Sequence, residues 1–247
     1  MIRLSRGPAP QKLDRAEIAA LTGEFKASGK DVWNKPYIRE ALLALSHCKC
    51  AYCEANISEE SKYMEVEHFR PKEDFPDLVV DWGNLLPACK RCNVRKGTYN
   101  VDAEGMIVNP FIHTPQDHFY FRDYRLRPRD DIGRNTTQIL YLNQLDRLVS
   151  VRMQVGDAIA SSLEKIRSQV EDYLAGPRMT RKRNQITTGV EELLKQAQPA
   201  SQFSALAATV LLGDDNYKWI KAQLEVLNLW TELDPLEIAA EGLALFP

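Results

Sequence analysis

Two short cysteine pairs constrain this chain more than any other feature of its sequence. Cys50-x-x-Cys53 and Cys89-x-x-Cys92 are separated by 35 residues. Two residues between paired cysteines let both sulfurs reach one ion, and two such pairs complete a tetrahedral four-sulfur zinc site. Thiol oxidoreductases use one such pair at a helix start, so a redox role fits less well. The pattern therefore predicts one structural Zn²⁺, whose four thiolates leave no position for a reactive water.

The fifth cysteine and the overall composition fit this interpretation. Cys48 could replace Cys50 as a ligand, but the C-x-x-C spacing favours Cys50 and leaves Cys48 as an expected core thiol. The 247 residues are 44% hydrophobic and 27% charged, which is typical of a globular protein. The chain has neither an apolar run of bilayer length nor a signal-peptide core. We therefore expect a cytoplasmic location and no membrane partner. In that reducing compartment metal-bound cysteines are favoured over disulfides.

Helical patterns lie on both sides of the cysteine-bearing region. Helices are expected over about 14–28 and 34–47, followed by a strand at 63–69 and a loop at 100–111 that leads into a short strand. Beyond Thr136 the chain is expected to be almost entirely helical. The predicted helices cover 151–174, 178–197, 201–212, 215–230 and 235–244. The first of them should bury Val151, Val155, Ile159, Leu163, Ile166, Val170 and Leu174.

The segment between the cysteine pairs carries polar residues of the types that hydrolytic sites use. Glu67-His68 lies on the predicted strand, Asn84 precedes the second pair, and Asn93 directly follows Cys92. A neutral imidazole such as that of His68 can take a proton from water near pH 7. A hard cation such as Mg²⁺ needs oxygen ligands, which Glu67 and Asn93 can supply. The alternatives are an N-cap role for Asn93 and an ordinary turn at Asn84.

The order carboxylate-His, Asn, then Cys-Asn-x-x-Lys-Gly resembles the HNH nuclease signature, in its variant with Asn at the third position. This resemblance covers residues 50–97. The stretches "RGPAP", "KCAYCE", "YMEVEHFRPK", "NLLPACKRCNVRKG" and "IVNPF" are similar to the HNH component of Septu-type anti-phage systems, which also occurs in some retron operons. The resemblance implies a mainly α chain with a small zinc-stapled ββα-metal unit, α+β overall.

The resemblance also implies roles for individual residues. His68 would act as general base, Glu67 and Asn93 would hold the catalytic Mg²⁺ or another divalent cation, and Asn84 would brace the loop beside His68. Many HNH proteins carry Asp before the catalytic His, so the longer Glu67 could displace the ion or share it with Glu65. No motif surrounds the remaining histidines, and the two tryptophans of this half fit a core. Structural roles are expected for His47, His113, His118, Trp33 and Trp82.

Basic side chains are clustered, although the formal net charge is only −2. The clusters at 90–96, 122–129 and 178–183 suit a site that grips a few phosphates, and each also fits a solvated helix face. Lys96 is favoured for phosphate because a helix start attracts anions. The nucleic-acid contacts expected in the first cluster are Lys90, Arg95 and Lys96. The expected substrate is DNA rather than RNA, although such residues grip phosphate in either.

The chain is expected to have three parts: an N-terminal arm with helices (1–47), the HNH nuclease unit with its zinc (48–115) and a helical domain (116–247). The helical domain shows no polar constellation of a second site, so it either completes the core or docks a partner. The Septu resemblance implies an ATPase partner encoded nearby. The alternative function is a non-catalytic zinc-stapled adaptor for nucleic acid or protein, which would have no use for Glu67-His68 together with Asn93.

Overall fold

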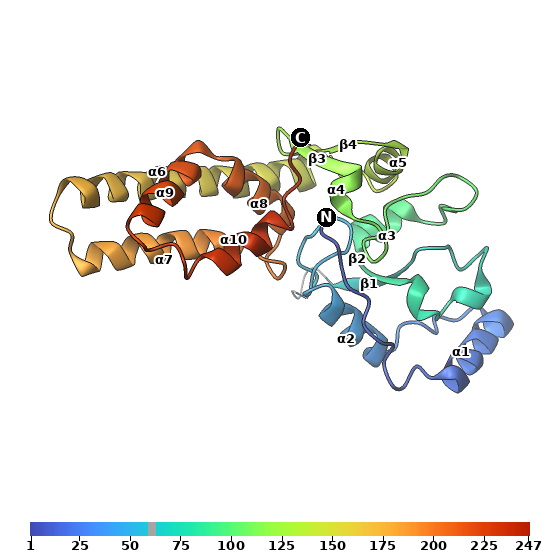
Figure 1. The fold of residues 1–247 in the computed structure, drawn as a ribbon. Coiled ribbons are helices and arrows are strands. Elements are labelled where there is room, and N and C mark those ends of the chain that lie inside the picture. Colours follow the sequence, from blue (N-terminus) through green and yellow to red (C-terminus); the bar gives the residue numbers. More distant parts are fainter. Residues whose placement is uncertain (59–62) are drawn as a thin grey trace. The chain divides into compact units, whose positions relative to one another are not determined.

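The computed structural model describes residues 1–58 and 63–247, and the chain divides into two compact units. Unit 1 comprises Met1–Phe119 and Arg127–Leu142, and unit 2 comprises Tyr120–Leu126 and Asn143–Pro247. Unit 1 contains both cysteine pairs together with the N-terminal helices, and unit 2 contains the long helices (Figure 1). The three parts predicted from sequence, 1–47, 48–115 and 116–247, stay a prediction. Residues 59–62 of the second part lie outside the described residues.

Two helices open unit 1 where the capping signals place them. Helix α1 (Arg15–Ser28) begins after Asp14, whose carboxylate accepts a hydrogen bond from the backbone N–H of Glu17 at 2.8 Å. It ends at Gly29, whose φ of 68° suits a residue without a Cβ. Helix α2 (Pro36–Leu45) carries proline in its first turn, where the missing N–H is not needed. Both helices confirm the prediction from sequence.

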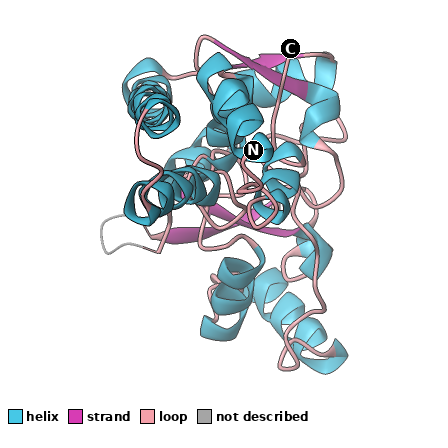
Figure 2. Ribbon diagram, turned by 60° about the vertical axis from the view of Figure 1, so that its left-hand side comes forward, coloured by secondary structure: helices cyan, strands magenta, loops and turns pink. Residues whose placement is uncertain are grey.

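The segment that carries both cysteine pairs forms a strand–strand–helix unit. Strand β1 (Met64–His68) pairs antiparallel with β2 (Leu85–Cys89), with His68 opposite Leu85, and α3 (Lys90–Lys96) follows β2 directly. The connection between the strands contains two 3₁₀ turns, η1 (Pro76–Leu78) and η2 (Trp82–Asn84). Strands form only two small sheets in the described part of the chain (Figure 2). The prediction of a ββα unit within a mainly α chain is confirmed.

The loop predicted at 100–111 is present, but no strand forms within that range. Residues 100–111 form turns and irregular chain, because nearby side chains satisfy their backbone groups in place of a partner strand. The N–H of Val108 donates to Thr136 Oγ1 at 2.7 Å, and the N–H of Phe111 donates to the side chain of Asn109 at 3.0 Å. The chain then continues through α4 (Pro115–His118), β3 (Phe119–Arg122), β4 (Arg125–Pro128) and α5 (Asp131–Ile139).

Unit 2 is built from helices around α6. A π-helical turn, η3 (Leu145–Val149), leads into α6, which contacts α7, α8 and α9. Side chains near the middle of α6, including Ile159, Leu163 and Val170, are fully buried in the core of the unit. The five predicted helices are confirmed as α6 (Ser150–Ala175), α7 (Thr180–Gln196), α8 (Ser204–Gly213), α9 (Asp215–Val226) and α10 (Asp234–Glu241). None of the helices in the described residues has both the length and the apolar composition that a membrane crossing requires.

Candidate active site

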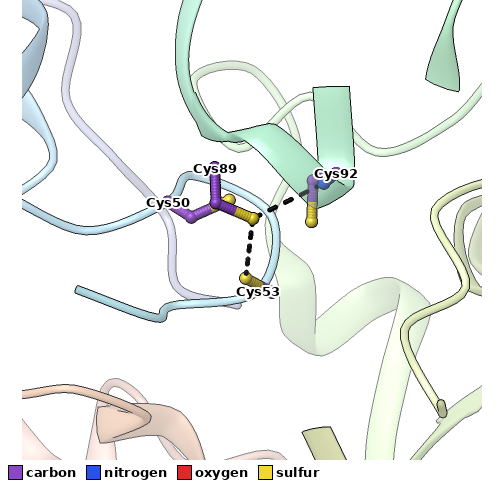
Figure 3. Close-up of side chains that lie close together, drawn as sticks. All are labelled: Cys50, Cys53, Cys89 and Cys92. Atoms are coloured by element: carbon purple, nitrogen blue, oxygen red, sulfur yellow. Dashed lines mark hydrogen bonds between the residues drawn. The ribbon is translucent and has the colours of Figure 1, made fainter. Parts of the chain in front are cut away.

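The two cysteine pairs meet at one point of unit 1. All four Sγ atoms lie within 4.8 Å of one another, and the side chains turn toward a common centre (Figure 3). Cys50 and Cys53 come from the tight turn that precedes β1, whereas Cys89 ends β2 and Cys92 lies in the first turn of α3. The backbone N–H of Ala51 donates to the carbonyl of Pro87 at 2.9 Å and thereby joins the first knuckle to β2.

The sulfur geometry fits a tetrahedral zinc ion. Four sulfurs at about 2.3 Å from Zn²⁺ would lie roughly 3.8 Å from each other. The Sγ atoms of Cys53 and Cys89 are 3.7 Å apart, a separation that matches this edge and exceeds a disulfide bond. Cys50, Cys53 and Cys92 are also buried, as a structural site requires. These four cysteines can therefore hold the predicted zinc, whereas half-buried Cys48 lies outside the group.

An arginine beside the sulfurs offsets their charge. Four thiolates around one Zn²⁺ carry a net charge of about −2, which is costly to bury without a compensating cation. Arg91 Nη2 donates to Cys92 Sγ at 3.3 Å, while its Nη1 donates to the carbonyl of Tyr141 at 3.2 Å. Burial lowers the pKa of Arg91, but the negative charge of the neighbouring sulfurs outweighs it and raises that pKa above its ordinary value. Arg91 therefore joins the cysteine cluster to the chain that follows α5, a role that its position between two cysteines could have suggested.

Apart from the cysteine cluster, the ββα unit contains a small polar cavity beside β1 and α3. Its volume is about 90 Å³, room for an ion with a few waters but not for a nucleoside. Glu67 and His68 of β1 and Asn93 of α3 all line it. The lining is completed by Trp33, Val66, Pro71, Lys72, Glu73 and Gly97. The cavity thus brings together the predicted base and both predicted ligands of the catalytic ion.

The imidazole of His68 is held in one orientation. Its Nε2 lies 2.8 Å from the carbonyl oxygen of Val79, and because a carbonyl only accepts, Nε2 carries the proton. The lone pair is therefore on Nδ1. The ring of Trp33 meets the imidazole edge-to-face, with centroids 4.8 Å apart. Burial is the main cause that lowers the pKa of His68 to about 4, so the ring is uncharged at neutral pH.

Glu67 is paired with a lysine deep inside the unit. Lys96 Nζ lies 2.8 Å from Glu67 Oε1 and donates to the carbonyl of His68 at 2.7 Å. Burial raises the pKa of Glu67 to about 7, and the ammonium of Lys96 opposes this shift. Lys96 is only 3% exposed. Its ammonium therefore fastens α3 to β1, an arrangement that argues against the direct phosphate contact expected of Lys96.

The two asparagines contact different parts of the site. Asn93 Nδ2 donates to Glu65 Oε2 at 2.8 Å, which leaves Oδ1 as the amide atom suited to a cation. Asn84 is buried between the strands: its Oδ1 accepts from the N–H of Arg70 at 2.7 Å, and its Nδ2 donates to the carbonyls of Arg70 and Leu78 at 3.0 and 3.2 Å. These bonds are the ones that a loop-bracing role would use. Glu67 and Asn93 supply the oxygen donors that a hard cation needs.

The other predicted contacts lie outside the cavity. Lys90 and Arg95 are exposed on α3, with the guanidinium of Arg95 4.7 Å from the centre of the Tyr141 ring.

Trp33 was expected in the core, but it is half-buried and forms one wall of the cavity, so that expectation is corrected. It stands 35 positions before His68, where no local pattern could connect the two. Trp82 is buried as expected and donates to the carbonyl of Gly7 at 3.0 Å.

Comparison with known proteins agrees with this geometry. The profile of the HNH endonuclease family matches residues 50–98. Over 231 residues the chain is 45% identical to the "Septu protein PtuB" of Bacillus thuringiensis, an alignment that covers 93% of this chain and 89% of that protein. A "Septu protein PtuB" of Bacillus mycoides (strain KBAB4) is 27% identical over 164 residues, covering 50% and 55% of the two chains. No solved structure matches the chain.

Proposed function

Since the chain belongs to the HNH endonuclease family, in the group that includes Septu protein PtuB, we propose that it hydrolyses phosphodiester bonds in nucleic acid. DNA is the substrate we favour. The observation that carries the proposal is the 90 Å³ cavity, in which an uncharged imidazole faces the same space as a carboxylate and an amide. A zinc-stapled adaptor would need the four cysteines but not this cavity.

His68 would act as the general base. Its Nε2–H is committed to the carbonyl of Val79, so Nδ1 is the atom that takes a proton from the attacking water. A pKa of about 4 keeps Nδ1 unprotonated before the substrate binds. The negative charge of a bound phosphate would raise this pKa toward the working pH, where proton transfer is most efficient. The base would therefore gain strength as the substrate arrives.

Glu67 and Asn93 would hold the catalytic divalent cation, for which Mg²⁺ is our proposal. When bound, such an ion supplies positive charge to the phosphorus and to the departing oxygen. Lys96 fixes one carboxylate oxygen of Glu67, so the other oxygen is the one that can turn toward the cavity. Asn84 would keep the loop after β1 in place, and the zinc would hold β2 and α3 against β1.

The full-length zinc-loaded protein should cleave nucleic acid only when a divalent cation is supplied. Panels of single- and double-stranded DNA and RNA would be incubated with Mg²⁺, with Mn²⁺ and in metal-depleted buffer, while bound zinc is measured in parallel. We expect cleavage of DNA with Mg²⁺ and none in the depleted buffer while the zinc is retained. Equal cleavage without any divalent cation would contradict the role of Glu67 and Asn93 as metal ligands.

We further propose that the nuclease acts in anti-phage defence, together with an ATPase partner that docks on unit 2. The similarity to Septu protein PtuB supports this. Tagged protein expressed with the product of the neighbouring ATPase gene should purify as a complex. A chain lacking residues 143–247 should lose the partner while the rest keeps its zinc. A clean monomer under every nucleotide condition would contradict docking.

A further inference from the structure

Lys72 is the cation at the catalytic cavity that the sequence did not single out. It is the one lysine or arginine among the described residues that line the cavity. Lys96 lies nearby, but its ammonium is fully buried and bonded to Glu67 and to the backbone of His68. Lys72 by contrast has a side chain that is 28% exposed, so its ammonium can meet a ligand that approaches from solvent.

Neighbouring side chains hold the ammonium of Lys72 near the reacting groups. Its Nζ lies 5.2 Å from the centre of the Trp33 ring, a cation–π distance, and that ring also contacts the imidazole of His68. Trp33 therefore positions the base and the cation against the same wall.

The present partner of Lys72 is one that a phosphate can replace. Lys72 Nζ pairs with Glu73 Oε1 at 2.7 Å, and the Glu73 side chain is 48% exposed. Exposed ion pairs of this kind contribute little stability, because water and salt screen them. The anionic oxygens of a phosphodiester can accept the hydrogen bond that Lys72 now donates to Glu73. A phosphate at the mouth of the cavity would also repel the carboxylate of Glu73.

We propose that Lys72 binds a phosphate of the nucleic-acid backbone at the mouth of the catalytic cavity, with Trp33 positioning its ammonium and Glu73 as the competing anion. This inference rests on the proposed function, since it assigns the cation that would hold the substrate beside His68. It places the phosphate contact on the loop that follows β1 and not on Lys96.

The test measures binding apart from cleavage. His68→Ala protein, full-length and zinc-loaded, would be titrated with short labelled DNA and RNA, single- and double-stranded, over a range of salt concentrations. Adding K72Q should weaken binding about tenfold near 0.1 M salt and reduce the slope of log affinity against log salt by roughly 0.7–0.9, because one phosphate contact is lost. Adding E73Q should tighten binding. A merely structural role for Lys72 would not give these opposite effects.

Lys26→Gln is the matched control. Lys26 lies in the same unit and pairs with Asp77 in an ion pair that is more exposed than that of Lys72, and it does not line the cavity. K72Q that matches K26Q in affinity and salt slope would overturn the inference, and the proposed function would stand if the native protein still cleaves. If the native protein never cleaves but K72Q reduces the slope, the phosphate site stands and hydrolysis fails. Absence of binding by the His68→Ala parent would overturn the phosphate site.

Discussion

Cys92→Ser protein is expected to lose its zinc and to unfold in unit 1. A structural zinc site contributes an apparent binding free energy of about 10–16 kcal/mol. A folded domain is stable by only about 5–15 kcal/mol in total, so a defective site can remove all of the stability of a small unit. Cys92 is buried in the first turn of α3, where it joins the helix to the knuckle at Cys50 and Cys53. Zinc content and hydrogen exchange across β1, β2 and α3 would measure the loss.

Cys48→Ser is the matched control for this substitution. Cys48 lies two positions from Cys50 but outside the four-sulfur group, so its replacement should leave one zinc per chain and a normal melting curve. Unit 2 has an apolar core of its own, and its helices should remain protected from exchange in both variants. Full zinc occupancy in Cys92→Ser, or equal zinc loss in Cys48→Ser, would contradict the ligand assignment.

Local signals were sufficient for most of the fold. The carboxylate of Asp14 and the backbone of Gly29 set the ends of α1, and both act within one turn of the helix. The spacing within each cysteine pair likewise anticipates a common metal, because two residues between ligands fix the reach of a knuckle. The HNH resemblance added the strand–strand–helix order of this region, and it named three of the residues that line the cavity, Glu67, His68 and Asn93.

The ends of α6 show where a regular pattern stops being informative. Ile159, Leu163 and Val170 are buried as predicted, but Tyr173 is buried near the end while Leu174 is only partly buried. Repeated steps of four advance around a helix of 3.6 residues per turn, so a face defined by such steps drifts away from the core. At the start of the helix, Arg152 is buried, whereas Val151, which was expected to be buried, is only partly so. Hydrophobic patterning cannot anticipate a buried arginine.

Contacts between distant segments account for what the sequence missed at the site. Trp33 reaches His68 from the loop before α2, and the tertiary fold alone brings these two residues together. Lys96 was assigned to phosphate because a helix start attracts anions, but it is the last residue of α3 and pairs with Glu67 instead. The extra methylene of glutamate relative to aspartate gives Glu67 more reach toward this lysine. A residue's neighbours therefore decided its role more than its own type did.

His68→Ala protein is expected to keep its zinc and fold but to lose cleavage by a factor of at least about 10²–10⁴, the usual effect of removing a general acid or base. The reason is that Nδ1 is the one atom of the imidazole free of the bond to Val79 and able to take a proton. Initial rates on the best substrate of the panel would measure the loss. Added imidazole should restore part of the rate, because it can enter the space that the side chain leaves.

His47→Asn is the control for this prediction, since His47 is exposed and asparagine tolerates its φ of 53°. It should cleave at the native rate. Unchanged cleavage by His68→Ala would eliminate the imidazole as base, even though Glu67 and Asn93 could still hold a cation. Native protein that binds nucleic acid with equal affinity before and after the substitution, and cleaves in neither form, would favour the zinc-stapled adaptor. The two functions share the four cysteines and separate at His68.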